Sequence, residues 1–483
     1  MRLVLIFISG CSLAKESNTL SGYWETELIS NVEVVEMPAI RRYLENDSRI
    51  LTIRNERIFA HEISSIEHPE WLNIEAEFPL VLASGEDVDF VITWDSTYIA
   101  GIHMDRIRLK DGENSLFELD IQGEIEPYVQ VKRQELSEIR SQIEEEVEDQ
   151  NLIGAAVAIV EGQDIVFLEG FGYADRENEI LVDPSVHRFR WASVAKNITA
   201  VLAVQQQEEG LLSLDDSIEH LYGEYQMPSL YLPDDWVDID SAEVIPADTG
   251  ELTLRMLLSH TGCVQHYSNG LVDPEPATTD RNDPAINTGM EWALEYWQDA
   301  PLICLPGTTF SYSTFGYNLA GVALESATGS SLEMLVTDRI SSVVGSMTLF
   351  PDRHWEPAPD RVVGYNRSEG VISAGGNSDV SWKLAGGGFI STPEDLARYC
   401  AGLLGEVLVG STVRDEELWT IQPATADYGL GFYVSGEYIS HSGSQQSART
   451  GLFIDRQQNR CIIAMSNSTW ADPFELIWAA LSQ

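Results

Sequence analysis

The 483-residue sequence predicts an α+β protein, in which an antiparallel sheet is flanked by helices and by an all-helical subdomain, preceded by a small all-β sandwich domain. Two observations support this fold class. Short β runs separated by turns fill residues 21–127, and β runs then occur at both ends of residues 134–483, with helical patterns between them. A sheet built from both ends of a domain must assemble from distant chain segments.

The chain is strongly acidic. It has 77 acidic and 29 basic residues, a formal net charge of −48 at pH 7, and only five lysines (Lys15, Lys110, Lys132, Lys196 and Lys383). A polyanion would be repelled, so the charge argues against nucleic acid or an anionic membrane surface as a partner. Solubility alone explains such acidity; adaptation to high salt is the alternative, and melting in low and molar salt distinguishes the two.

The first eleven residues are typical of an export leader. Met1-Arg2 precedes an apolar run over residues 3–8, which ends in Ser9-Gly10-Cys11. This pattern resembles a bacterial lipoprotein signal, with Cys11 as the lipidated residue and anchor to a membrane. An ordinary export signal, or a start codon placed too late, is the alternative. We therefore expect an exported protein, periplasmic or extracellular if it is not anchored.

The other cysteines show no metal-binding pattern. Cys263, Cys304, Cys400 and Cys461 are scattered without a Cys-x-x-Cys spacing, so no zinc site is predicted. They could be buried thiols or form disulfides, and buried thiols are the more common outcome. Neither a metal nor an organic cofactor is expected.

Residues 21–127 predict the β-sandwich. Runs at 49–54, 88–94 and 116–123 have strand character, and turn sequences at 84–87 and 111–114 precede the last two. The Trp-Leu of residues 71–72, the turn ending in Gly85-Glu86 and the closing run to Gly123 resemble Ig-like modules found beside bacterial surface enzymes. This resemblance implies a fold, and a spacer role is favoured over ligand binding.

The second domain opens with a predicted amphipathic helix at 135–149. A hairpin of β runs at 155–160 and 165–172 follows, and a helix starts near Ser193. Residues 222–344 are expected to be mostly helix and loop. Strands are predicted at 431–434, 438–441, 451–454 and 460–465, before a final helix at 473–481.

Ser193 and Lys196 are the candidate reactive pair. Residues three apart share a helix face, so the amine can reach the hydroxyl. A desolvated lysine can lose its proton near neutral pH and accept the proton of serine, while free N–H groups at a helix start stabilise an oxyanion. A second Ser-x-x-Lys, Ser12 to Lys15, lies in the leader without helical context and is interpreted as a chance match.

Two later stretches carry further candidates. Tyr312 precedes a helical run, where a nearby lysine ammonium could lower its phenol pKa and make it a proton shuttle; the alternative is a half-buried ring used in packing. Residues 437–444 read as a strand running into a small-residue turn, with His441-Ser442-Gly443-Ser444 at its end. Such an edge can offer an N–H group to an oxyanion; the alternative is a solvated histidine at a strand end. A further His260-Thr261-Gly262 is interpreted as a helix end, with Gly262 as C-cap.

In this order, the three pieces resemble the serine β-lactamase and penicillin-binding-protein-like family, closest to its class C, DD-peptidase and esterase branch. Ser193 and Lys196 match the first motif, Tyr312 the second, and His441-Ser442-Gly443 the third. Residues 254–262, 385–396 and 428–432 also look like family segments. Thr314 replaces the usual asparagine of the second motif. His441, partly charged at neutral pH, replaces the lysine that helps lactamases hold a substrate carboxylate.

The resemblance implies a serine hydrolase that forms an acyl-enzyme on a small peptide, ester or β-lactam-like substrate. Lys196 with Tyr312 would deprotonate Ser193, and the N–H groups of Ser193 and Ser444 would bind the oxyanion. Thr314, Ser442 and Gly443 would contact substrate. Two alternatives remain: a true class C-like β-lactamase, and a non-catalytic surface or scaffold protein that keeps the fold.

Overall fold

A computed structural model describes residues 134–481, except 234–240, 268–274 and 359, and parts of residues 29–126. The predicted leader with Cys11 lies outside the described residues. The chain divides into two compact units, Met1–Val129 and Gln130–Gln483. Among the described helices, none combines the length and apolar character needed to span a bilayer.

The N-terminal unit consists of strands. One sheet has the order β1-β4-β9-β7, a second has the order β2-β11-β10-β6 with β3 also on β11, and β5 pairs with β8. Phe90 and Ile92 of β9, and Ile107 and Leu109 of β10, are buried at alternate positions, so each strand turns one face to a core. The Ig-like assignment stays a prediction, and β2 and β3 pair with β11 in parallel. The bounds are β1 Ile29–Ser30, β2 Val34–Glu36, β3 Ile40–Arg41, β4 Ser48–Arg54, β5 His61–Ile63, β6 Ser65–Glu67, β7 Leu72–Glu75, β8 Leu80–Leu82, β9 Asp87–Trp94, β10 Gly101–Asp111 and β11 Asn114–Glu126.

A seven-stranded sheet organises the second unit. Its order is β14-β13-β12-β25-β24-β23-β22, and β12 pairs antiparallel with β25 from the far end of the chain. The predicted antiparallel sheet assembled from both ends of the domain is therefore confirmed. The strands are β12 Gly154–Glu161, β13 Asp164–Asp175, β14 Ile180–Leu181, β22 Tyr433–Ser435, β23 Tyr438–Gln445, β24 Ala448–Asp455 and β25 Arg460–Ser466.

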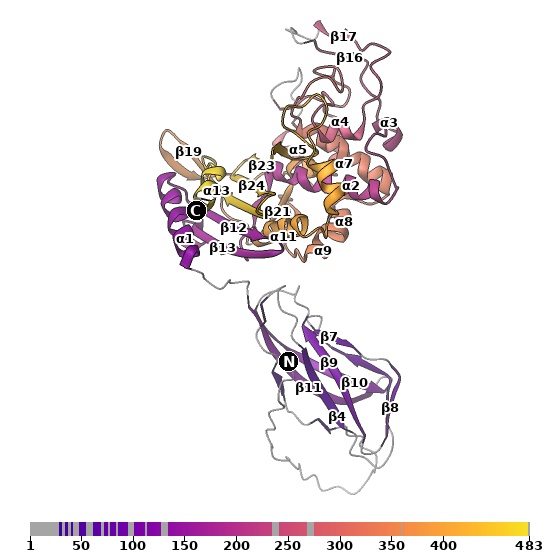
Figure 1. Cartoon of the computed structure of the whole chain (residues 1–483), viewed down its shortest axis with the longest axis vertical. Helices are drawn as coiled ribbons and strands as arrows, with labels where there is room; N and C mark the ends of the chain where they lie inside the picture. Colours follow the sequence, from indigo (N-terminus) through magenta and orange to yellow (C-terminus); the bar gives the residue numbers. More distant parts are fainter. Residues whose placement is uncertain are drawn as a thin grey trace. The chain divides into compact units, whose positions relative to one another are not determined.

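Helices cover both faces of this sheet (Figure 1). Helices α1 (Gln134–Asp149) and α13 (Pro473–Leu481) share a core with Ala155, Val157 and Ile159 of β12. Alternate β12 residues point to the opposite face, and they too are buried. Helix α11 (Pro393–Leu404) contacts β12 and β25. Because both faces are covered, β12 is a nearly continuous apolar run.

The helical part lies beside this sheet (Figure 1). It is built on α2 (Ala195–Glu208), α7 (Thr314–Thr328) and α10 (Leu384–Gly387). Most of 222–344 is short helix and loop, as predicted, but a small β16–β17 pair also occurs there. The remaining elements are η1 Ala192–Val194, α3 Ile218–Leu221, α4 Leu254–Leu258, α5 Thr278–Arg281, α6 Met290–Leu294, α8 Leu332–Val336, η3 Thr337–Ser341, α9 Ser342–Val344, η4 Ser381–Lys383, α12 Ser411–Val413, η5 Arg414–Leu418, and strands β15 Phe189–Arg190, β16 Leu230–Tyr231, β17 Glu243–Val244, β18 Phe350–Pro351, β19 Tyr365–Ser368, β20 Val371–Ala374 and β21 Phe389–Ser391.

The cysteines divide into two pairs. Cys263 and Cys304 form a disulfide, so the preference for buried thiols was wrong for this pair. Cys400 and Cys461 are buried free thiols. Among the described residues, no group of three or more His, Cys, Asp or Glu side chains is arranged to hold a metal ion.

Candidate active site

Ser193 lies at the junction between the sheet and α2. It belongs to the 3-10 turn η1, and the α-helix begins two residues later at Ala195, slightly beyond the predicted start. Ala192, directly before it, has a φ of +48°, a left-handed conformation that costs an L-residue roughly 1–2 kcal/mol. The serine is therefore presented on a tight turn, with its side chain at a cavity.

Lys196 is fully buried and touches the serine. Its Nζ lies 3.1 Å from Ser193 Oγ, 3.2 Å from Thr314 Oγ1 and 2.6 Å from the Gly386 carbonyl oxygen. Burial, together with the positive charge of Lys383, holds the pKa of Lys196 well below its usual value. Lys196 accordingly loses its proton more readily than an ordinary lysine, and the serine hydroxyl lies within its reach.

The neutral form of Lys196, which a general base requires, can make all three of these contacts. Such an amine has two N–H donors and one lone pair. The Gly386 carbonyl can only accept, and the Thr314 hydroxyl can accept as well. The lone pair is then left for the hydroxyl hydrogen of Ser193, which is the arrangement that a general base requires.

Tyr312 lies directly beside this pair. Its hydroxyl is hydrogen-bonded with Ser193, and Lys196 Nζ is 5.0 Å from the centroid of its ring. We expected a lysine ammonium to lower the phenol pKa; instead, burial raises the pKa of Tyr312. The expectation was wrong because burial, which disfavours the charged phenolate, has the largest effect on the pKa of Tyr312. Tyr312 therefore keeps its proton and can act as an acid.

The ring of His260 packs against the ring of Tyr312, a role that the sequence did not predict. Its ring lies 4.1 Å from the Tyr312 ring, centroid to centroid, and its Nδ1 accepts a hydrogen bond of 3.0 Å from the Ser313 N–H. Burial keeps the pKa of His260 well below its usual value. The C-cap interpretation of Gly262 was also wrong: His260 has the left-handed φ of +60°, and a Cβ on Gly262 would come within 2.8 Å of Leu257.

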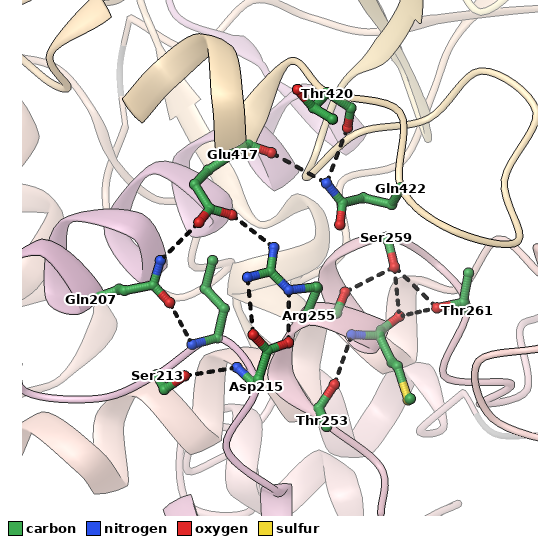
Figure 2. A network of polar contacts seen from close by, with 12 residues as sticks. Gln207, Ser213, Asp215, Thr253, Arg255, Ser259, Thr261, Glu417, Thr420 and Gln422 are labelled. Carbon is green, nitrogen blue, oxygen red and sulfur yellow. Dashed lines mark hydrogen bonds and ion pairs between the residues drawn. The ribbon is translucent and has the colours of Figure 1, made fainter. Parts of the chain in front are cut away.

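A polar network fixes the turn that carries His260 (Figure 2). The Ser259 hydroxyl donates to the Arg255 carbonyl at 2.8 Å and lies 3.0 Å from the Thr261 hydroxyl. Arg255 itself pairs with Asp215 at 2.8 Å and with Glu417 at 2.7 Å. Helix α4 is thus tied to two distant segments, and the turn after it is held by its own hydroxyls.

His441 differs from the expected cation at a strand end. It is buried within β23, and burial lowers its pKa to about 3. Nδ1 lies 2.7 Å from the Ser442 carbonyl, which only accepts, so this nitrogen carries the proton and Nε2 accepts from the Tyr428 hydroxyl at 3.1 Å. His441 is therefore neutral, and the expectation of partial charge was wrong.

The His-Ser-Gly-Ser stretch lies inside the strand, where we expected a turn. Strand β23 continues to Gln445, and Gly443 pairs with Thr450. A Cβ on Gly443 would lie 2.4 Å from the Trp191 carbonyl oxygen and 3.2 Å from the Ser193 nitrogen. Glycine is required here because the strand passes directly against the serine turn.

These segments surround one cavity of about 630 Å³. Five predicted residues besides Ser193 line it, namely Tyr312, Thr314, His441, Ser442 and Ser444. The polar lining residues that were not predicted are His266, Tyr267, Glu275, Arg281, Ser378, Asp379, Lys383, Tyr433, Gln445 and Gln446. Thr314 contacts Lys196 rather than serving only as a substrate contact. Because lysine is rare in this chain, Lys383 could have been named as a candidate site residue from the sequence.

A comparison with protein-family models shows to which family the chain belongs. The model described as Beta-lactamase matches residues 139–481. The chain belongs to the β-lactamase family. This family comprises serine hydrolases, and the recognition made from the three ordered motifs is confirmed.

Relatives within the family are distant. The mitochondrial serine beta-lactamase-like protein LACTB of Homo sapiens is 24% identical over 311 residues, which cover 52% of this chain and 53% of that protein. Protein flp of Staphylococcus aureus strain MW2 is 20% identical over 333 residues, covering 67% of this chain and 61% of that protein. The chain thus spans about half to three fifths of the length of these curated relatives.

Solved structures share the fold. A penicillin-binding protein homologue from Pyrococcus abyssi has a TM-score of 0.58 at 21% identity, covering 72% of this chain and 76% of that one. A D-stereospecific amidohydrolase from Streptomyces sp. has a TM-score of 0.55 at 21% identity, covering 71% and 98%. EstCE1, described as a hydrolase with promiscuous acyltransferase activity, has a TM-score of 0.53 at 17% identity, covering 72% and 98%.

Proposed function

We propose that the protein is a serine acyl hydrolase that cleaves esters or amides of small acids or peptides through an acyl-enzyme on Ser193. The observation that carries this proposal is the contact between the Ser193 hydroxyl and the buried amine of Lys196, at 3.1 Å. A serine needs an adjacent base to become a nucleophile. In its neutral form this amine donates to the Gly386 carbonyl and the Thr314 hydroxyl, and its lone pair can accept the proton of Ser193.

In the acylation step, Ser193 Oγ attacks the substrate carbonyl carbon while its proton moves to Lys196 Nζ. In this proposal the oxyanion accepts hydrogen bonds from the backbone N–H groups of Ser193 and Ser444. The close approach of Gly443, which directly precedes Ser444, to the Ser193 nitrogen supports this pairing of donors. Tyr312 donates its phenol proton to the leaving alcohol or amine and regains a proton from Lys196. The carbon–oxygen or carbon–nitrogen bond breaks, and the acyl group stays on Ser193.

In the deacylation step, a water molecule attacks the acyl-enzyme and loses its proton to Lys196 Nζ, which is neutral again after acylation. The proton returns to Ser193 Oγ, and the carboxylic acid departs. His260 keeps the Tyr312 ring in place during both steps through its ring contact. Lys196 is the base in both steps, so this mechanism requires no histidine base.

The experiment is a panel of p-nitrophenyl esters, D-amino-acid peptides and a chromogenic cephalosporin, assayed with wild type and Ser193→Ala. We expect turnover of esters or peptides that falls by a factor of at least about 10² in the variant. Full turnover of every accepted substrate by Ser193→Ala would contradict the proposal. D-amino-acid substrates are included because solved relatives are described as a D-stereospecific amidohydrolase and as SurE with D-Leu.

True β-lactamase activity is the weaker candidate. Thr314 stands in place of the asparagine of the second motif, and His441 is neutral and hydrogen-bonded to Tyr428. We therefore expect the cephalosporin to acylate Ser193 slowly without efficient turnover. If no substrate and no serine-reactive probe engages Ser193, a non-catalytic scaffold is the better account.

A further inference from the structure

A second lysine faces the same cavity as Ser193. Lys383 is the last residue of η4, and its Nζ donates to the Tyr267 hydroxyl at 2.7 Å. The ammonium also lies 5.0 Å from the Tyr267 ring centroid and 5.2 Å from that of Trp382. These aromatic faces hold the charge in place. One of its three N–H donors is used by Tyr267, so others remain for a ligand.

Within the part of the chain that the structure describes, no carboxylate forms an ion pair with Lys383. Two acidic residues line the same cavity, but both have other partners. Glu275 pairs with Arg281. Asp379 accepts hydrogen bonds from Asn287, from Ser381 and from the backbone of His354, at 2.9 Å each. Lys383 therefore keeps a charge that the protein itself does not neutralise by direct contact.

The surrounding charges add to this positive end. Arg190, whose charge acts on Lys383, shares the carboxylate of Asp352 with a second arginine: Asp352 pairs with Arg190 at 2.5 Å and is in direct contact with Arg361. One carboxylate between two guanidinium groups leaves a positive charge. In a chain of net charge −48, a cavity end with surplus positive charge is a local exception, and a low-dielectric wall strengthens its effect on a bound ion.

We propose that Lys383 forms an anion-binding subsite of the Ser193 cavity and selects substrates that carry a carboxylate. This inference rests on the proposed acyl hydrolase function and adds the substrate class. The cation expected on β23 is absent because His441 is neutral and bonded to Tyr428. The anion therefore binds on η4, a different wall of the cavity.

The subsite is within reach of the reacting carbonyl. Lys383 contacts Tyr267, Tyr267 is hydrogen-bonded with Thr314, and Thr314 contacts Lys196 beside the serine. A chain of side-chain contacts thus connects the ammonium to the nucleophile along one wall. A small substrate can touch Ser193 with its carbonyl and Lys383 with its carboxylate.

The charge of Lys383 also changes with pH in a range close to neutrality, where its effect on substrate preference can be measured. Burial lowers its pKa to about 8, with Glu275 and Asp379 acting to raise it and Arg190 and Arg281 acting to lower it. Lys383 is therefore mostly protonated at pH 7 and loses its charge as the pH rises through about 8. The preference for anionic substrates weakens over the same interval.

The test compares matched substrate pairs that differ by one negative charge. On the acyl side, the pair is mono-p-nitrophenyl glutarate and its methyl ester. On the leaving-group side, it is the butyrate ester of 3-hydroxybenzoic acid and of methyl 3-hydroxybenzoate. The readout is the ratio of kcat/KM for the anionic and neutral members. Because both members acylate the same serine, this ratio cancels effects of a substitution on the nucleophile.

For Lys383→Met we expect the ratio to fall by about 10- to 100-fold in at least one pair at pH 7, as the loss of a charged hydrogen bond implies. Lys383→Arg keeps the charge and should retain most of the ratio. The wild-type ratio should also fall between pH 7 and 9, while that of Lys383→Arg should not. A ratio that Lys383→Met leaves unchanged in both pairs would overturn the subsite.

A binding measurement separates this inference from the proposed function. The intact anionic esters are titrated into Ser193→Ala and into Ser193→Ala with Lys383→Met, and the second protein should bind at least one of them about tenfold more weakly. Equal binding in both proteins, for both esters, would refute the subsite even if no ester is hydrolysed. Ser193-independent or absent hydrolysis would refute the function but not charge-dependent binding.

Discussion

Tyr428 donates its hydroxyl hydrogen to Nε2 of His441 across 3.1 Å, and this bond determines what the third motif can do. Both side chains are buried, and the other ring nitrogen of His441 is bonded to the Ser442 carbonyl. A histidine with both nitrogens occupied has no free donor for a substrate carboxylate. Its role is to hold strand β23 beside the serine turn.

Tyr428→Phe should therefore destabilise the protein. It leaves Nε2 of His441 buried without a donor, which costs about 1–3 kcal/mol in the free energy of unfolding, measured by urea titration. Tyr438→Phe is the matched control, because Tyr438 is 49% exposed and keeps its ring contact with Phe453; its change should stay within about 0.5 kcal/mol. Equal stability of the two variants would contradict this account of His441.

Gly443→Ala should reduce acylation strongly. The added methyl group would meet the Trp191 carbonyl oxygen at 2.4 Å, so the strand must move away from the serine turn and separate the two oxyanion donors. We expect a loss of about 10²–10³ in kcat, as for removal of one donor. Gly223→Ala is the control, since nothing lies within 4 Å of its added Cβ. Near wild-type kcat in Gly443→Ala would show that the donors do not depend on this approach.

The pH dependence of kcat/KM should report Lys196. Activity requires its neutral form, and its pKa is lowered, so kcat/KM should rise with pH at a midpoint below the ordinary lysine value of about 10.4. The cavity histidines do not titrate near neutrality, since burial lowers the pKa of His266 to about 4 and that of His441 to about 3.

Lys383→Met should move this midpoint to higher pH with a neutral substrate. The positive charge of Lys383 lowers the pKa of Lys196, so its removal makes the protonated form of Lys196 less costly. Lys383→Arg keeps the charge and should keep the midpoint. A midpoint that stays in place or falls in Lys383→Met would show that the ascending limb belongs to another group.

Reduction of the Cys263–Cys304 disulfide should lower the melting temperature. The bond joins the segment of Gln265 and His266 to the segment before Tyr312, across a sequence separation of 41 residues. Loss of such a crosslink costs about 2–5 kcal/mol. The double variant Cys263→Ala/Cys304→Ala should melt lower than wild type and be insensitive to reductant. Thiol counting confirms reduction, and an unchanged melting temperature after it would contradict the prediction.

Much of the second unit could be predicted because its signals are local. The apolar runs of β12 and β25 and the amphipathic pattern of α1 are set by periodicity, and Ser193 and Lys196 are three residues apart on adjoining turns. The order of the motifs then indicated the family. These features could be predicted because each depends on residues that are neighbours in the sequence.

The wrong predictions concern properties set by distant residues. The pKa of Tyr312 and the neutrality of His441 follow from burial and from partners such as Tyr428. His260 looked like a helix end, and only its tilted ring contact with Tyr312 from another segment shows its place at the site. Desolvation and long-range packing leave no pattern in the local sequence.

The most direct measurement is covalent labelling of Ser193 with a neutral fluorophosphonate, followed by mass spectrometry of the digested protein. We predict one adduct per chain, located on the peptide that contains Ser193. We also predict that Lys196→Met slows labelling by about 10²-fold or more, as expected for loss of the general base, while the matched change Lys110→Met, at a partly exposed lysine of β10 that pairs with Glu67, does not slow it. An adduct on another residue, or labelling of Ser193 at the wild-type rate in Lys196→Met, would contradict the account.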